Sequence, residues 1–564
     1  MKKSVAMFAF LSLLAVTPAF GQGFLKPVIG RYQAPEVGIQ VLRTSPTVSP
    51  SLTALVQNGG LPLTVNDMVR LTLENNFNLG INRFAPVLSE YAIIQAMSSF
   101  DPTLSLSGTV NRSTSASLTQ IDGAAVPSNL SGNYRATFSQ NLKTGANYSI
   151  GMNMSRRSSN DAFARFNPSW SASVNYQVSQ PLLRGFGTRL NTASIVIARN
   201  NLENSQIAFE DQVMDLVLQA TNTYWDLVYA IETIRVRQNA LGLAQQTLGE
   251  NERKVEIGTL PAIDLNQSRL DVAQQQLQLL TAQNSRRQVE DQIKTMVSRV
   301  ADPGLVLVSL NPIDTITDRT DAILGVEEAI QLAYRNRPDM RQYELDLENS
   351  DLNLLTAKNN LLPALDLSLS YTQNGVGGTQ FIRGGLGGQV TEVIPGGLSD
   401  AFGNIYGFDF TGYSVGFNLN IPLSNRGARS AYERQVVTHR QTESRREALM
   451  QSIALEVRNS YNQVVLTRQQ IEVADASRDL AETNLNGEQR KYDLGASQIR
   501  FVIQEQNNLT SAEVALLQAR INYLKAIAAY ERAIGRTLEL NNIRIEEQLR
   551  PNLAGETVPG VASR

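Results

Sequence analysis

Two very long helical patterns restrict the folds that this chain can adopt. They run from about 190 to 257 and from about 427 to 494, and each would reach roughly 100 Å at about 1.5 Å per residue, well beyond the width of an ordinary domain. An apolar residue recurs every seven positions along both patterns, which is typical of a coiled-coil seam. The seam comprises Val213, Ala220, Leu227, Ile234, Leu241, Leu248 and Val255 in the first pattern, and Met450, Val457, Val464, Ile471, Leu485 and Tyr492 in the second, where Arg478 interrupts it.

Each long pattern ends at a glycine. Gly258 follows RKVEI and Gly495 follows RKYDL, and a second helical pattern begins directly afterwards, at about 262–299 and 498–534. Glycine adopts the left-handed backbone conformation that reverses the chain after a helix at little steric cost. The sequence therefore predicts two long antiparallel helical hairpins.

The whole arrangement occurs twice. LTVNDMVRLTLENNFNL at 63–79 matches LGVEEAIQLAYRNRPDM at 324–340 without a gap, and SVNYQVSQPL at 173–182 matches SVGFNLNIPL at 414–423. Self-similarity at this scale indicates an internal duplication. We divide the chain into a first repeat at 61–300, a linker at 301–323 and a second repeat at 324–540.

Four segments alternate between apolar and small polar residues, which predicts strands with one apolar face. They lie at about 103–111, 169–179, 364–372 and 412–422. A proline marks each boundary between helix and strand, and these junction prolines are Pro102, Pro181, Pro363 and Pro422. A further hairpin is compatible with residues 134–155, but its place stays open, and so does an ordinary sandwich with one wetted face.

The remaining segments are predicted to lie outside the repeats. Lys2 and Lys3, an apolar run and a small-residue site near Gly21 indicate a secretory signal at 1–21. A Pro- and Ser-rich extension follows at 22–60, and a loose tail at 541–564. The glycine-dense segment 374–407 is expected to be a mobile extracellular loop without a packed core.

Composition excludes several classes of protein. The chain has no cysteine, one histidine (His439, expected on a solvated helix face) and a net charge of -2, so we expect no disulfides, no metal site, no catalytic triad and no nucleic-acid partner. No nucleotide-binding glycine motif is present, and we expect neither a cofactor nor an enzyme. After the signal no run approaches the roughly 18 apolar residues of a membrane-spanning helix, so any membrane span is expected to consist of strands.

The ordered, duplicated set of motifs resembles the TolC-type outer-membrane factor family from about 63 to 540. The motifs that carry the resemblance are FDPTLSLS, NLLPALDLS, VSQPLLRGFG, LNIPLSNRG, RKVEIGTLPAIDL and RKYDLGASQIRFV. The resemblance implies a mainly α fold with membrane strands, in which a homotrimer forms a coiled-coil helical barrel in the periplasm and a twelve-stranded β-barrel in the outer-membrane lipid, with four strands from each chain. It also implies docking to a periplasmic membrane-fusion adaptor and an inner-membrane pump.

The resemblance assigns candidate residues to two sites. The adaptor-docking tips would comprise Lys254, Gly258, Thr259, Leu260, Lys491, Tyr492, Gly495, Ala496 and Ser497. The pore constriction would lie just beyond the second turn, at Arg500, Phe501, Gln504 and Glu505. Several family members carry acidic residues at this constriction, whereas Phe501 and Gln504 stand there in this chain.

The leading hypothesis is therefore a passive exit duct of a tripartite efflux or type I secretion system. The alternative is a structural or adhesive coiled-coil protein of the cell envelope without channel activity, since heptads specify association and not function. Conductance in a planar bilayer would separate the two. The sequence leaves open whether the cargo is a drug, a metal, a protein or another compound.

Overall fold

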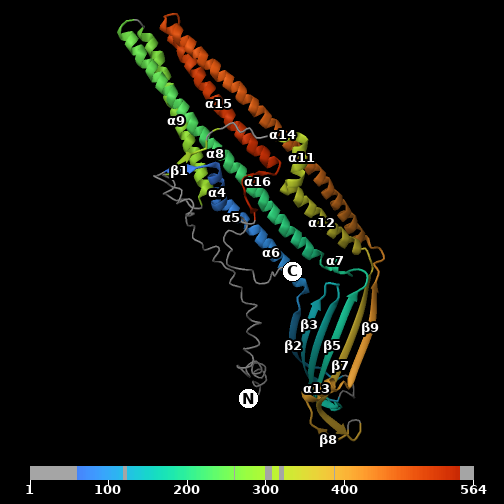
Figure 1. Cartoon of the computed structure of the whole chain (residues 1–564). Helices are drawn as coiled ribbons and strands as arrows, with labels where there is room; N and C mark the ends of the chain where they lie inside the picture. The colour runs from blue at the N-terminus through green and yellow to red at the C-terminus, as the bar shows by residue number, and fades with distance from the viewer. Residues whose placement is uncertain are drawn as a thin grey trace, which may run out of the picture.

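The computed structural model describes residues 60–117, 123–258, 261–298, 308–314, 316, 323–385 and 388–545. The predicted signal at 1–21, nearly all of the extension at 22–60 and most of the tail lie outside these residues. The chain is elongated, with a sheet at one end and long helices running away from it to two helical tips (Figure 1).

The helices are α4 (Val65–Asn75), α5 (Phe77–Asn82), α6 (Phe84–Met97), η2 (Ser98–Phe100), α7 (Thr188–Asn191), α8 (Ala193–Glu256), α9 (Ala262–Val297), α11 (Val326–Asn336), α12 (Pro338–Asn359), α13 (Leu398–Gly407), α14 (Arg426–Asp493), α15 (Ile499–Ala533) and α16 (Thr537–Leu540). The strands are β1 (Gly60–Leu63), β2 (Thr103–Thr114), β3 (Ser128–Asn141), β4 (Asn147–Ser159), β5 (Phe166–Pro181), β6 (Ser309–Pro312), β7 (Ala364–Arg383), β8 (Val390–Ile394) and β9 (Phe410–Asn420).

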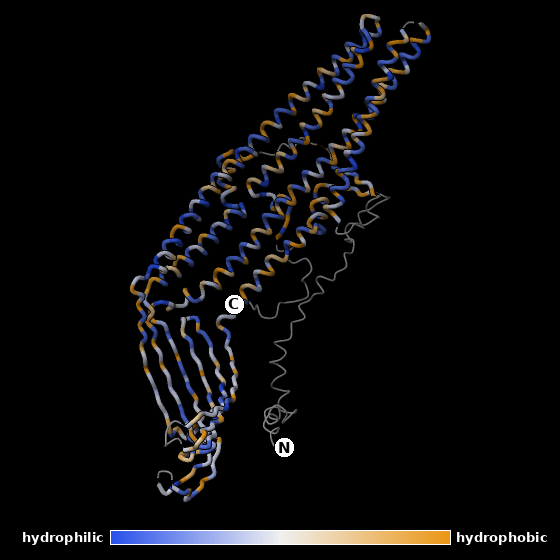
Figure 2. The backbone as a smooth tube through the Cα atoms, turned by 180° about the vertical axis from the view of Figure 1, so that it is seen from behind, coloured by the Kyte–Doolittle hydropathy of each residue, from blue (hydrophilic) through white to orange (hydrophobic). Residues whose placement is uncertain are grey.

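The two predicted long helices are α8 and α14, of 64 and 68 residues. Towards the tips, α8 packs against α9 and α15, and α15 packs against α14, so the layer runs α9, α8, α15, α14 (Figure 1). Nearer the sheet, α6 packs on α8, and α12 packs between α8 and α14. Polar and apolar residues alternate along these helices (Figure 2). In the part of the chain that the structure describes, no helix has the length and apolar composition of a membrane span.

Each long helix organises one hydrophobic core. The first core surrounds α8, where the seam residues Val213, Ala220 and Leu227 are fully buried. The second surrounds α14, where Val457 and Val464 are fully buried against α11 and α15. The heptad prediction is confirmed for these five residues and, in the second seam, for Met450, Ile471, Leu485 and Tyr492, which also pack in a core. The remaining residues of the first seam are half-buried, namely Ile234, Leu241, Leu248 and Val255.

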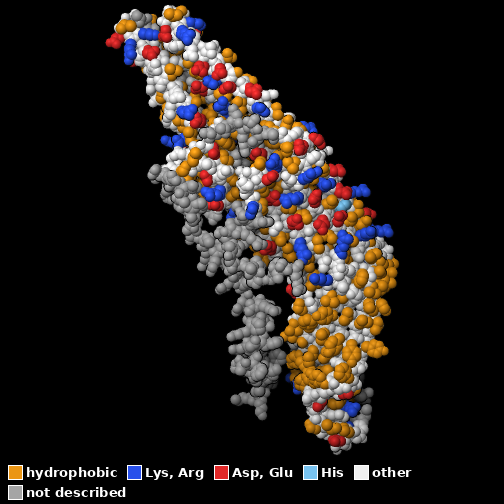
Figure 3. Space-filling model, in the orientation of Figure 1, with side chains coloured by type: hydrophobic (Ala, Val, Ile, Leu, Met, Phe, Trp, Pro, Cys, Tyr) orange, Lys and Arg blue, Asp and Glu red, His pale blue; other side chains and the backbone are white. Residues whose placement is uncertain are grey.

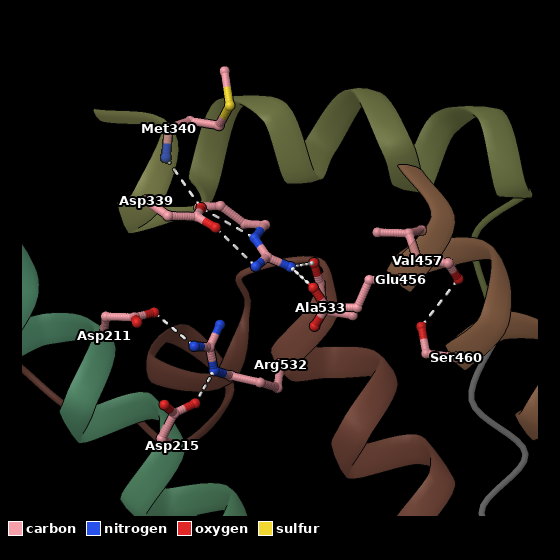
Figure 4. Close-up of polar contacts among 10 residues, drawn as sticks. Asp211, Asp215, Asp339, Met340, Glu456, Val457, Ser460, Arg532 and Ala533 are labelled. Carbon is pink, nitrogen blue, oxygen red and sulfur yellow. Dashed lines mark hydrogen bonds and ion pairs between the residues drawn. The ribbon is translucent and has the colours of Figure 1, made fainter. Parts of the chain in front are cut away.

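Buried ion pairs join the two halves of the helical layer (Figure 4). The Arg532 guanidinium on α15 lies 2.6 Å from Asp211 and 2.7 Å from Asp215, both on α8. Burial raises the pKa of the Asp211 carboxyl, and the charge of Arg532 opposes this rise. Arg532 therefore ties the second repeat to the first.

A second buried arginine ties α11 and α12 to the end of the long hairpin. Arg337 pairs with Asp339 at 2.9 Å and with Glu456 of α14 at 2.6 Å, and it donates to the Ala533 carbonyl of α15 at 3.3 Å. Burial alone lowers the pKa of Arg337, but the hydrogen bond and charge of Asp339 outweigh it and the pKa is raised. The guanidinium thus stays charged between its partners.

The sheet has the strand order β2, β3, β4, β5, β7, with β8 and β9 both paired to β7, and every neighbouring pair is antiparallel. Strands occur at the four predicted positions, as β2, β5, β7 and β9. The prediction of four strands per chain was nevertheless wrong, because β3 and β4 lie between β2 and β5 in full register. The segment 134–155, whose place stayed open, belongs to this inserted hairpin.

The prediction of an unpacked loop at 374–407 was also wrong. β7 continues to Arg383, and α13 packs on the sheet, burying Ala401 and Ile405 against Ala172 of β5. The physical reason lies in the glycines: a Cβ on Gly375 would lie 1.8 Å from the Ala401 carbonyl oxygen. Glycine density marks a close helix-on-strand approach here, and not a flexible loop.

The predicted linker contains β6, which pairs in parallel with β1, and the Tyr224 hydroxyl of α8 donates to the Leu63 carbonyl at 3.2 Å beside this pair. Two smaller expectations need correction. The tail packs at its start, because Ile543 and Ile545 contact the first core. His439 is mostly buried and lies 3.3 Å from the Ser350 hydroxyl of α12.

Replacing Arg532 with Met should destabilise the helical layer. The substitution leaves Asp211 half-buried without its cation, at a cost of about 2 kcal/mol, which is below the value for a fully buried pair because Asp215 is largely exposed. We expect a fall of about 2 °C or more in the thermal unfolding midpoint followed by circular dichroism. Arg536→Met, in the same region but with an exposed partner, is the matched control, and an equal effect of both changes would contradict the assignment.

Candidate functional site

The six-stranded region of the sheet has one apolar face and one polar face. Register pairs Leu104 of β2 with Phe138 of β3, and Ile150 of β4 with Tyr176 of β5. Tyr176 in turn pairs with Tyr371 of β7. Hydrophobic side chains gather over the sheet, whereas charged side chains gather over the helices and at the far end of the sheet (Figure 3). A face of this composition suits contact with lipid.

Small hydroxyl and amide side chains cover the other face and bond across strands. Ser155 and Ser171 approach to 2.7 Å, and Ser370 and Ser414 to 2.8 Å. Arg135 donates to the Asn153 amide oxygen at 2.7 Å. This face offers many hydrogen-bonding groups to water, which suits the lining of an aqueous channel.

The four predicted junction prolines lie where the sheet meets the helices. Pro102 and Pro363 directly precede β2 and β7, Pro181 is the last residue of β5, and Pro422 follows β9. Proline removes a backbone donor and therefore suits the end of a strand. The four prolines therefore mark the boundary at which the sheet joins the helical layer.

The structure brings the two helix reversals together at the far end of the molecule (Figure 1). Gly258 and Gly495 have φ values of +77° and +74°, the left-handed conformation that the sequence predicts. In the second turn, the Ala496 amide donates to the Lys491 carbonyl at 2.8 Å and caps α14. Thr259 and Leu260 lie outside the described residues.

A buried polar chain links the two hairpins just above the turns. The Tyr492 hydroxyl donates to the Asn251 amide oxygen at 2.7 Å, and the Asn251 amide nitrogen donates to the Ser268 hydroxyl at 2.9 Å. Asn251 is 0% exposed, and burial raises the pKa of Tyr492. Lys254 makes a cation–π contact with the same tyrosine, and its ammonium lies 4.1 Å from the centre of the Tyr492 ring.

The second turn is fixed by Glu488. Its carboxylate accepts hydrogen bonds from Ser497 and, at 2.9 Å, from Lys491. These two hydrogen bonds hold the pKa of Glu488 below its usual range, and the bond from Ser497 has the largest effect. Ser497 and Lys491 therefore have structural partners within the turn, whereas Ala496 is exposed.

Two exposed apolar side chains at the tips escaped the sequence prediction. Ile257 and Leu494 directly precede the two glycines and are 71% and 84% exposed. The sequence offered one indication of them, because a large apolar residue directly precedes the glycine in both of the similar turn sequences. Both side chains are therefore available for contact with another molecule at this end of the protein.

The predicted constriction residues share an exposed side of α15 beside the turn. Ile499, Val502 and Ile503 are buried, while Arg500, Phe501 and Gln504 are exposed and Glu505 is half-buried. Phe501 is 42% exposed, and the Arg500 guanidinium carbon lies 4.7 Å from the centre of its ring. The Glu505 carboxylate accepts from Asn508 at 3.3 Å. The prediction that these residues form a constriction concerns an assembly and stays a prediction.

Replacing Tyr492 with Phe should loosen the contact between the two hairpins. The change leaves the fully buried Asn251 amide oxygen without its donor, at a cost of about 1–3 kcal/mol. We expect faster amide hydrogen exchange in 245–258 and 485–500, measured by mass spectrometry. Tyr432→Phe removes the hydroxyl of a half-buried tyrosine near the other end of α14 and is the control. Unchanged exchange at the tips would show that the polar chain does not hold the hairpins together.

Comparison with known proteins agrees with this architecture. The family profile described as outer membrane efflux protein matches residues 68–298 and 329–536. The chain is 24% identical over 351 residues to the pyoverdine export outer membrane protein OpmQ of Pseudomonas aeruginosa, and the match covers 60% of this chain and 65% of OpmQ.

Solved structures with the same fold include the CmeC outer membrane channel of Campylobacter jejuni, with a TM-score of 0.59, 16% identity and coverage of 86% of this chain and 89% of CmeC. VceC of Vibrio cholerae gives a TM-score of 0.57 and 13% identity, covering 84% of this chain and 96% of VceC. Because the family profile covers well over half of the chain, the protein belongs to the outer membrane efflux protein family, whose members are TolC-like channels of the outer membrane.

Proposed function

We propose that the protein is a passive, trimeric exit duct that carries cargo from a periplasmic adaptor and an inner-membrane pump to the outside of the cell. The observation that carries this proposal is the continuity of one chain. A sheet with one apolar and one polar face leads directly into a helical layer built on helices of 64 and 68 residues. The two segments matched by the family profile would be copies of one ancestral unit, each supplying one long hairpin.

The edges of the helical layer support assembly with further copies. Exposed apolar residues recur at heptad spacing along α9, at Ile263, Leu270 and Leu277. A similar stripe follows α14 at the opposite edge and comprises Leu466, Val473 and Leu480. Coiled-coil seams of this kind associate with other helices, and α14 of one copy against α9 of the next would close a ring.

The surface beside the α14 stripe has the shape that such a contact needs. A groove between α14 and α15 is lined mainly by Leu466, Val473, Ala474, Ala512, Ala515 and Ala519, with polar glutamine, serine and asparagine side chains at its margins. Small alanine side chains let a neighbouring helix approach closely. The groove is therefore better suited to contact with a helix of a neighbouring chain than to contact with lipid or water.

The tips would meet the adaptor. Ile257 and Leu494 offer apolar contacts, and Glu488, Lys491 and Ser497 keep the second turn in one conformation. A preorganised turn loses less conformational entropy when it binds a partner. In this proposal the two apolar side chains contact the adaptor, and the glycines allow the chain to reverse direction at the turns.

Purified protein should form trimers that conduct ions in a planar bilayer, and Phe501→Ser should raise the single-channel conductance. Three Phe501 rings at one level would narrow the pore and exclude water, and serine removes this apolar bulk. Phe77→Ser, the same change at an exposed residue of α5 away from the turn and from the two stripes, should leave conductance unchanged. Absence of conductance in every variant would favour the structural or adhesive alternative, and equal conductance of wild type and Phe501→Ser would reject the constriction.

The double substitution Ile257→Asp with Leu494→Asp should abolish adaptor docking while leaving the trimer intact. Aspartate places a charge in an apolar contact, where desolvation is costly. A photo-crosslinker at the exposed Ala496 should capture a membrane-fusion adaptor in the parent and lose at least ten-fold of the product in the double variant. Ile81→Asp, an exposed isoleucine of α5, is the control, and undiminished capture would remove these side chains from the docking surface.

A further inference from the structure

The inserted hairpin consists of complete membrane-length strands. β3 and β4 have 14 and 13 residues, compared with 12 in β2 and 16 in β5, and about 9–11 residues suffice to cross a bilayer. Their apolar residues stand in phase with those of their neighbours: Phe138 faces Leu104, and Ile150 faces Tyr176. The hairpin therefore continues both faces of the sheet without interruption.

The turn of this hairpin is fastened to the helical layer. The Gly187 amide donates to the Thr144 carbonyl at 3.1 Å, and the Gln140 side chain donates to the Phe100 carbonyl at 2.9 Å. Gly145 has a φ of +92°, and a Cβ there would lie 2.3 Å from the Gly185 carbonyl oxygen. The turn is thus built for this position between the β2 and β5 junctions, and the hairpin has a fixed place in the sheet.

The two outer strands have unpaired long edges. All twelve residues of β2 and all but one of the eleven residues of β9 are exposed. Lipid cannot satisfy unpaired backbone groups, so a sheet in a membrane has to close on itself. The sheet has six long strands when both edge strands are counted, so β9 runs opposite to β2. A second copy of the chain can therefore continue the antiparallel pattern.

We propose that this protein forms an eighteen-stranded outer-membrane barrel, with six strands from each chain and closure by β9 of one chain on β2 of the next. The inference rests on the proposed trimer and replaces the predicted count of twelve. A barrel of eighteen strands is about one and a half times as wide as one of twelve at the same tilt.

The arc that each chain covers supports the higher count. Six strands spaced about 4.8 Å apart and tilted about 40° occupy roughly 38 Å of circumference. The four helices α6, α8, α12 and α14 pack side by side at the end of the layer that adjoins the sheet (Figure 1), and they occupy roughly 32–40 Å at spacings of about 8–10 Å. Four strands would cover only about 25 Å. The sheet and the helical layer therefore match in width when β3 and β4 belong to the barrel.

Disulfide trapping in isolated outer membranes tests the strand count, because the parent chain has no cysteine. Leu104→Cys with Phe138→Cys, and Ile150→Cys with Tyr176→Cys, should each form a bridge within one chain. Leu104→Cys with Tyr176→Cys is the matched comparison and should not form one, since three strand spacings separate these positions by about 14 Å and a disulfide needs Cα atoms within about 7 Å. A bridge between positions 104 and 176, or the absence of either in-sheet bridge, would overturn the count.

A second set of variants tests the closing seam. Leu419→Cys combined with Leu104→Cys or with Leu106→Cys should link neighbouring chains in at least one combination and give covalent products of two and three chains, but not more. A conducting trimer without these products would overturn closure by β9 on β2. A parent protein that is neither trimeric nor conducting would instead refute the proposed function, whatever bridges form inside the sheet.

Discussion

The need to pair every backbone group of a membrane sheet governs the architecture of this protein. The sheet buries one apolar face in lipid only if its edges are satisfied, and in one chain both β2 and β9 end with an open edge. In the proposed trimer, neighbouring copies would satisfy these edges, and the six long strands of each chain would let those copies continue a single antiparallel pattern.

The helical layer meets a related constraint by different means. Helices of this length cannot bury their seams within one compact core, so α8 and α14 each organise their own core and share α15 between them. Arg532, a buried arginine of α15, then joins the two halves through Asp211 and Asp215 of α8. Arg337 holds α11 and α12 against α14 and α15 within the second half. Such pairs add little net stability compared with apolar packing, but breaking one is costly. The contact of Arg532 with α8 helps to set the relative placement of the two hairpins.

The tips combine rigidity with exposure. The Tyr492, Asn251 and Ser268 chain fixes one hairpin against the other, and the Glu488 carboxylate fixes the second turn. Ile257 and Leu494 remain in solvent beyond this fixed frame. A rigid turn that presents apolar side chains suits the docking role proposed for the tips.

Local patterns in the sequence were enough to predict the long helices, their seams, the glycine reversals and four of the strands, because each arises from a periodicity or a backbone preference that acts over a few residues. The position of the β3–β4 hairpin, the packing of α13 on Gly375 and the polar chain at the tip became visible only in the folded structure. These features depend on which distant segments lie side by side. The alternation within a short segment does not show which strands will be its neighbours in a sheet. The sequence around a glycine that allows a helix to pack closely can look the same as the sequence around a glycine in a loop.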